Sequence, residues 1–152
     1  MKIYLDVSCL NRPFDDQSQS RIRLETEAVT IILEECERGD WVQVSSEIAT
    51  IEIDANPDRR KRSRVRLLLP DNDAIIPLTE SHFARARILE SFGFKPADAL
   101  HVASAESLAV DVLLSCDDRF CKIARRNQKR VLVKVANPVD WLQEIDHGAD
   151  IG

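Results

Sequence analysis

The sequence predicts an α/β fold in three layers, with helices on both faces of a central, mainly parallel β-sheet. Short apolar runs alternate with longer helical patterns, the connections between them are short, and the apolar runs are continuous. Strands buried on both faces have such continuous runs, which is typical of parallel sheets covered by helices. The length suits one domain, which we expect over residues 1–145, followed by a frayed tail over 146–152.

The chain opens with an apolar run at residues 2–5, which we expect to be the first strand. Apolar positions then recur at helical spacing from about 20 to 38, with charged residues on the other face. Gly39 follows and suits the left-handed position that ends many helices. The second strand is expected at residues 41–45.

Two helices should follow this strand. A serine at position 45 or 46 can cap the first of them. The sequence Asn-Pro-Asp at 56–58 breaks that helix and starts a basic one, which Pro70 closes.

In the second half of the chain, short strands again alternate with helices. We expect a strand at 74–78, a helix at 80–92 ended by Gly93, a buried central helix from Pro96, a strand at 110–115, a helix at 118–128 and a last strand at 131–135. Proline suits the first position of a helix because it has no N–H to leave unpaired. Trp141 and Leu142 should anchor a C-terminal turn against the core.

The composition excludes several classes of protein. Hydrophobic residues make up 44% and charged residues 31% of the chain, which is typical of a globular protein. No apolar stretch approaches the roughly 18 residues of a membrane span, and the N-terminus does not resemble a secretory signal. The four cysteines form no C-x-x-C pair, which favours reduced thiols over disulfides or a zinc site. We therefore expect a cytoplasmic protein with no membrane partner.

The net charge of −5 argues at first against a nucleic-acid partner. The basic residues are nevertheless concentrated in two blocks, at 59–66 and 119–130. Two bound divalent cations would change the sum to −1, because −5 + 4 = −1. Each block is either a solvated helix face or a set of phosphate contacts, and the sequence leaves both open.

Acidic residues stand where the predicted strands end. Asp6 follows the first strand, and Asp117 and Asp118 follow the strand at 110–115. Ligands of parallel sheets bind outside the carboxyl ends of the strands, so these side chains can meet in space. Asp98, in the first turn of the buried helix, can join them. Carboxylates gathered without a cation repel one another, so the pattern predicts a divalent metal site.

Two assignments within this acidic set are ambiguous. Glu47 and Glu52 are five residues apart, about 140° round a helix, so both cannot point at one metal. Glu47 lies in the first turn, where acids favour the helix dipole, and we therefore favour Glu52. Of the neighbouring pair, we expect Asp117 to be the ligand and Asp118 a helix cap or an outer-shell residue. His101 is expected to be packed and hydrogen-bonded rather than a ligand.

The order of four motifs resembles the PIN-domain ribonucleases, which include the VapC-type toxins. The motifs are LDVS, SSEIATIEI, PADALHVASAE and LLSCDDRF, and the resemblance covers about residues 2–142. It places the four acidic positions of the family on Asp6, Glu52, Asp98 and Asp117, with Ser8 as the polar companion of the first. Many members carry another acid where this chain has Arg119, and Asp118 is a possible substitute for it.

The resemblance implies a PIN-like fold and an endoribonuclease that depends on Mg²⁺ or Mn²⁺. It implies metal ligation by Asp6, Asp98 and Asp117, a catalytic Glu52, and supporting roles for Ser8 and Asp118. Its implied partners are an RNA substrate, an antitoxin protein and a second copy of the chain, for which the helix at 20–38 offers a surface. For RNA contacts the block after Asp117 is better placed than 59–66, and we expect them from Arg119, Lys122 and Arg126.

Two other readings of the residues stay open. Phosphatase and phosphotransfer folds also gather acids at strand ends, but they usually carry an Asp where this chain has Ser8, or a lysine after a later strand. A non-catalytic PIN-like module that binds RNA or protein is the second alternative. The presence of all four acids argues against it.

Overall fold

The computed structural model describes the backbone of residues 1–151 and the side chains of residues 1–146. The centre is a five-stranded sheet in the order β3-β2-β1-β4-β5, and every neighbouring pair is parallel. The strands are β1 (Lys2–Leu5), β2 (Val42–Ser46), β3 (Ile75–Ile76), β4 (Val112–Leu114) and β5 (Val135–Ala136). The predicted α/β class with a mainly parallel sheet is confirmed.

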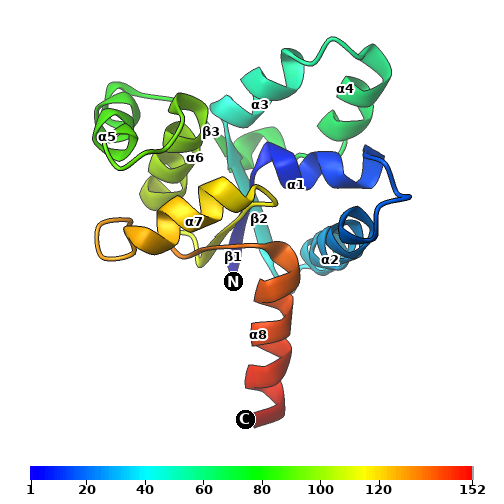
Figure 1. Ribbon diagram of the computed structural model, residues 1–152. Coiled ribbons are helices and arrows are strands. Elements are labelled where there is room, and N and C mark those ends of the chain that lie inside the picture. Colours follow the sequence, from blue (N-terminus) through cyan, green and yellow to red (C-terminus); the bar gives the residue numbers. More distant parts are fainter. Residues whose placement is uncertain (152) are drawn as a thin grey trace.

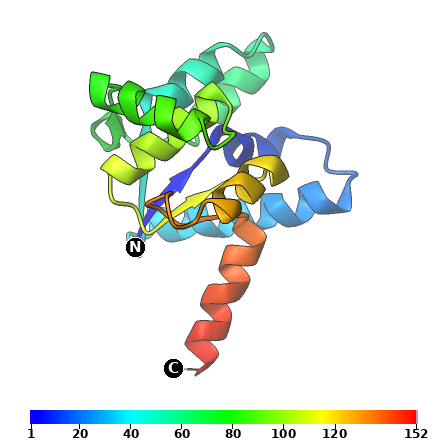
Figure 2. The same ribbon diagram turned by 60° about the vertical axis from the view of Figure 1, so that its left-hand side comes forward.

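Helices cover both faces of this sheet (Figures 1 and 2). They are α1 (Val7–Asn11), α2 (Ser20–Glu37), α3 (Glu47–Asp54), α4 (Arg59–Arg66), α5 (Glu80–Glu90), α6 (Pro96–Ser107), α7 (Asp118–Arg126) and α8 (Pro138–Ile151), with 3₁₀ turns η1 (Arg12–Phe14) and η2 (Asn72–Ala74). Tyr4 and Leu113 point to the face packed by α5, α6 and α7. Ile3 and Leu114 point to the opposite face, against α1, α2 and α8. Alternate strand residues therefore fill two cores, as the pleat requires.

The strand register brings three carboxyl ends to one edge of the sheet. Leu5 of β1 pairs with Leu114 of β4, and the Asp6 amide donates to the Leu114 carbonyl at 3.0 Å. β2 ends beside them at Ser46. Helix α6 contacts both β2 and α3, which brings its first turn to the same edge. This edge is where the sequence places its acidic residues.

The structure corrects the last strand and the C-terminal turn. Only Val135 and Ala136 pair with β4, whereas residues 131–135 were expected to form the strand. Val131 is instead buried in the core and Leu132 is 76% exposed, so this apolar run is divided between core and solvent. Trp141 lies in α8 rather than in a turn, and its ring packs edge-on against Trp41 at 5.2 Å.

Other element boundaries differ by smaller amounts. The strand expected at 74–78 is only two residues long, and the helix expected at 80–92 ends at Glu90. The fraying expected of residues 146–152 falls mostly on residues whose side chains lie outside the described part, and α8 itself extends to Ile151. In the part of the chain that the structure describes, no helix is both long and apolar enough to cross a membrane.

Candidate active site

Asp6 occupies the junction between β1 and α1, where it caps the helix. Its Oδ1 accepts hydrogen bonds from the Ser8 hydroxyl at 2.5 Å and from the Cys9 amide at 3.0 Å. The residue is 4% exposed, and burial raises the pKa of its carboxyl, while His101, Ser115, Ser8 and Cys9 oppose that rise. A buried carboxylate is thus held in a fixed orientation largely by neutral donors, which leaves its charge available to a cation.

Asp98 provides the evidence that the predicted acids gather in one place. Burial raises its pKa to about 6, the neighbouring His101 opposes the rise, and repulsion from Asp6, Asp117 and Glu52 adds to it. Because the interaction between charges falls with distance, only nearby carboxylates can raise this pKa. The contact between Ser8 and Ser115, which joins the Asp6 and Asp117 segments, and the bond from Glu52 to His101 of α6 place the four acids at the same edge of the sheet.

A chain of buried hydrogen bonds orients Glu52. Its Oε1 bonds to Nε2 of His101, whose Nδ1 lies 2.7 Å from the Tyr4 hydroxyl. That hydroxyl also lies 2.7 Å from the Ser46 hydroxyl. Tyr4 is fully buried, and burial raises its pKa, so the phenol stays protonated. His101 is packed and hydrogen-bonded, as the sequence predicts, and it links Glu52 to the core.

Glu47 has a different task from Glu52. Its Oε1 accepts a hydrogen bond from the Leu78 amide at 2.9 Å, which ties the start of α3 to the segment after β3. The helix geometry thus separates the two glutamates as their spacing requires. The structure brings Glu52, and not Glu47, to the acidic group.

Asp117, rather than Asp118, caps helix α7. Asp117 is the cap of α7, since its Oδ1 accepts from the amides of Arg119 at 2.9 Å and Phe120 at 3.3 Å. Asp118 does not cap the helix. It is 78% exposed on its side chain and forms a two-pronged ion pair with Arg21 at 2.7 and 2.6 Å. Asp117 joins the acidic group as well as capping the helix, while Asp118 faces α2.

Ser115 is a site residue that the sequence reasoning did not select. Its hydroxyl lies 3.4 Å from that of Ser8 and accepts from the Asp117 amide at 3.1 Å. The Ser8 hydroxyl in turn accepts from the Cys116 amide at 2.9 Å. These two hydroxyls connect the Asp6 segment to the Asp117 segment. The signal was present in LLSCDD, where a serine stands two residues before the acid.

The donors at this edge suit a hard cation. Carboxylate and hydroxyl oxygens are the ligands that Mg²⁺ and Mn²⁺ prefer. Burial raises the pKa of the neighbouring Cys9 thiol, so it stays protonated and is a poor ligand. Among residues 1–146, no three His, Cys, Asp or Glu side chains are already close enough to hold a metal ion together. Without a cation the carboxylates repel one another and stay apart. A bound cation would attract them, and their side chains would then have to rotate toward it.

The three basic residues expected to contact RNA have different surroundings along α7. Arg119 is exposed and donates to the Gly93 carbonyl at 3.2 Å, on the side of α7 nearest the end of α5. Lys122 lines a cleft between α7 and α2. Arg126 is exposed in the last turn of the helix. Within the other basic block, Lys61 pairs with Asp15 at 2.6 Å and Arg66 pairs with Asp54.

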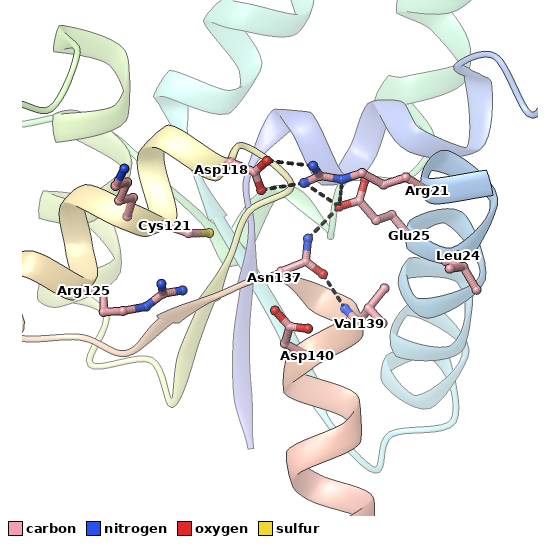
Figure 3. Close-up of a pocket in the computed structure, with 10 residues that line it drawn as sticks. Arg21, Leu24, Glu25, Asp118, Cys121, Arg125, Asn137, Val139 and Asp140 are labelled. Carbon is pink, nitrogen blue, oxygen red and sulfur yellow. Dashed lines mark hydrogen bonds and ion pairs between the residues drawn. The ribbon is translucent and has the colours of Figure 1, made fainter. Parts of the chain in front are cut away.

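An ionic network beside the acidic edge was not predicted either. Glu25 of α2 is 1% exposed, and it accepts from Arg12 Nε at 2.8 Å and Asn137 Nδ2 at 2.6 Å. Arg21 approaches the same carboxylate at 3.4 Å (Figure 3). It also donates to the Cys116 carbonyl at 3.3 Å. A buried carboxylate needs such partners. The network anchors residues 116–118, the segment that carries Asp117.

Residues 3–126 match the family model of the PIN domain. The chain belongs to the PIN domain family. Proteins of this family are generally nucleases. No curated protein sequence matches this PIN domain.

Solved structures share the fold of this PIN domain at low sequence identity. FitAcB from Neisseria gonorrhoeae is 19% identical with a TM-score of 0.57, over 90% of this chain and 97% of that chain. VapBC2 from Rickettsia felis, crystallised with a DNA fragment from its promoter, is 10% identical with a TM-score of 0.56, over 90% of this chain and 98% of that chain. These likenesses extend the fold assignment beyond the matched residues to most of the chain.

Proposed function

We propose that this PIN domain is a cytoplasmic endoribonuclease that hydrolyses RNA phosphodiester bonds with the help of Mg²⁺ or Mn²⁺. The observation that carries the proposal is the placement of the acids at one edge: Ser8 and Ser115 join the segments of Asp6 and Asp117, and Glu52 bonds to His101 on the helix that carries Asp98. Such a group of acids at the carboxyl edge of a parallel sheet has a physical purpose when a divalent cation neutralises it. The family assignment supports nuclease chemistry independently.

In this proposal Asp6, Asp98 and Asp117 hold the metal. The bound ion would supply a hydroxide at neutral pH and polarise the phosphoryl oxygen. The remaining work belongs to residues that fix the ligands. Ser8 and the Cys9 amide hold one carboxylate oxygen of Asp6, and capping of α7 holds Asp117.

Glu52 is the fourth acid of the proposed catalytic group. Because His101 and Tyr4 connect it to Ser46, its carboxylate is oriented from inside the core rather than by solvent. An oriented carboxylate at the edge of the metal site can accept a hydrogen bond from the attacking water. No nucleophilic side chain is needed for this chemistry.

RNA digestion tests the proposal. Purified protein should cleave single-stranded or structured RNA with Mg²⁺ or Mn²⁺ and should not cleave it in EDTA. Asp6→Asn should abolish cleavage while leaving the fold intact, whereas Asp40→Asn, at an exposed aspartate away from the site, should cleave like the wild type. Equal activity of wild type and Asp6→Asn would refute the assignment and favour a non-catalytic module that binds RNA or protein.

We further propose that the protein is the toxin of a toxin–antitoxin pair. The likeness in fold to VapBC2, a structure that contains promoter DNA, supports this proposal. An antitoxin encoded by an adjacent reading frame should then copurify with the chain and inhibit its RNase activity. If no neighbouring product binds, a free-standing processing enzyme is favoured instead.

A homodimer through α2 belongs to the same proposal. This helix buries Ala28, Val29 and Ile32 but leaves the apolar side chains of Leu24 and Ile31 exposed. Exposed apolar residues on one helix are a common feature of self-association surfaces. Sedimentation should give twice the mass of the chain, and a monomer at micromolar concentration would contradict this assignment.

A further inference from the structure

A cleft lies beside the acidic edge, between α2, α7 and the start of α8 (Figure 3). It encloses about 490 Å³. Its lining residues are Arg21, Leu24, Glu25, Asp118, Cys121, Lys122, Arg125, Asn137, Val139 and Asp140. The members from α7 are spaced as one helix face, so this face of α7 forms one wall of the cleft.

After the ion pairs of the cleft are counted, positive charge remains unmatched. Arg21 is matched by Asp118, and Glu25 is matched by Arg12 behind the wall. Within residues 1–146, no ion pair engages Lys122 or Arg125, and both are exposed. Asp140 is the one carboxylate of the lining that remains against these two cations, so the unmatched charge of the cleft is positive and favours an anion.

The wall of the cleft is continuous with the proposed catalytic group. Asp117 caps α7 at the acidic edge, and Asp118, the next residue, lines the cleft. With a rise of about 1.5 Å per residue, Lys122 lies about 7.5 Å and Arg125 about 12 Å further along the helix axis than Asp117. A chain of nucleotides that leaves the acidic edge along α7 therefore reaches both cations.

Hydrogen bonds fix the floor of the cleft. Asn137 donates to the buried Glu25 at 2.6 Å, and its side-chain oxygen accepts from the Val139 amide at 2.8 Å. Figure 3 shows this amide side chain between α2 and the start of α8. Since Arg21 of α2 also pairs with Asp118 of α7, polar contacts join the three elements that form the cleft. The helix that carries the two cations is therefore held in place before a ligand binds, which reduces the entropic cost of binding.

We propose that this cleft binds two backbone phosphates of the RNA strand next to the scissile bond, through Lys122 and Arg125. The inference rests on the proposed function, because its ligand is the substrate of that function. The ten lining residues include no aromatic side chain on which a base could stack. The contact therefore adds affinity without selecting a base sequence.

The same stretch of chain provides a matched control. Arg126 ends α7 and Lys129 follows it in a turn, and both are exposed cations outside the cleft. The cleft assignment replaces the expectation that Arg126 contacts RNA. The double variants K122A/R125A and R126A/K129A each remove two positive charges from one short stretch of chain. The two variants therefore have the same net charge. Only K122A/R125A removes the cations of the cleft.

The test measures binding of a fluorescein-labelled single-stranded oligouridylate by anisotropy, in EDTA, between about 50 and 200 mM salt. K122A/R125A should weaken binding roughly tenfold and lower the slope of log K against log salt by about 1.4, which is two phosphate contacts of about 0.7 each. R126A/K129A should lower the slope by less than half as much. Unchanged urea midpoints should show that both variants are folded.

The outcomes separate this inference from the proposed function. Equal losses in both double variants, no loss in K122A/R125A, or no binding by the wild type would overturn the cleft assignment. Cleavage plays no part in the measurement because EDTA removes the metal. A protein that binds as predicted but never digests RNA would therefore leave the cleft assignment in place and refute only the nuclease proposal.

Discussion

Replacing Asp98 by asparagine should stabilise the folded protein at neutral pH in the absence of metal. The pKa of Asp98 is raised from 3.8 to about 6, first by burial and then by its acidic neighbours. Each unit corresponds to about 1.4 kcal/mol, so keeping this carboxylate charged costs up to about 3 kcal/mol. The side chain is in partial contact with solvent, which screens part of the cost, and we expect a gain of about 1 to 2 kcal/mol.

The gain should depend on pH with a definite sign. The folded state binds the Asp98 proton more tightly than the unfolded state does, so its stability falls as pH rises from 3.8 through about 6. Above that range the wild type carries the full cost of the buried charge. The asparagine variant should therefore be more stable than the wild type at about pH 7.5, and this advantage should vanish near the ordinary pKa of aspartate.

Urea unfolding in EDTA at these two pH values measures the difference. Asp40→Asn is the matched control, because it removes an exposed carboxylate and should change stability by less than about 0.5 kcal/mol. If Asp98→Asn is no more stable than the wild type at neutral pH, or gains as much in acid, then neither burial nor neighbouring charge raises the pKa of Asp98 and the reasoning fails.

Two further predictions follow from the same contacts. The Tm of the wild type should rise with Mg²⁺ concentration once that concentration exceeds the Kd, and Asp6→Asn should abolish the rise. Calorimetric scans check this, and equal rises in both proteins would contradict it. Glu25→Ala should cost about 1 to 3 kcal/mol in urea unfolding, because Arg12 and Asn137 lose a buried acceptor while Arg12 keeps its ion pair with Asp15. Glu27→Ala, exposed on the same helix, should cost little, and similar losses in both would show that the network contributes nothing.

The acids at the strand ends were predictable because strand direction in a parallel sheet is fixed by its connections. Asp6 and Asp117 each follow an apolar run, and parallel strands end at a common edge. The choice of Glu52 over Glu47 was less secure. Helix geometry says only that the two diverge, and the contact of Glu52 with His101 depends on how α6 packs against α3.

Other features depended on tertiary contacts that have no local signal. Glu25 has charged neighbours in the sequence of α2, which favours an exposed position. Its burial depends on Arg12 and Asn137, which come from other parts of the chain. Two adjacent aspartates compete to cap α7, and the ion pair with Arg21, 97 residues away, occupies Asp118. The last strand was misplaced because an apolar run also suits core-filling residues such as Val131.

Binding of Mn²⁺, followed by electron paramagnetic resonance, tests the central claim most directly. The account predicts that the wild type removes free Mn²⁺ from solution, that Mg²⁺ displaces it, and that Asp6→Asn, Asp98→Asn and Asp117→Asn each weaken binding strongly. Asp118→Asn should bind like the wild type, because Asp118 is paired with Arg21. If the wild type leaves Mn²⁺ free, or if the three variants bind it unchanged, these carboxylates do not form a metal site.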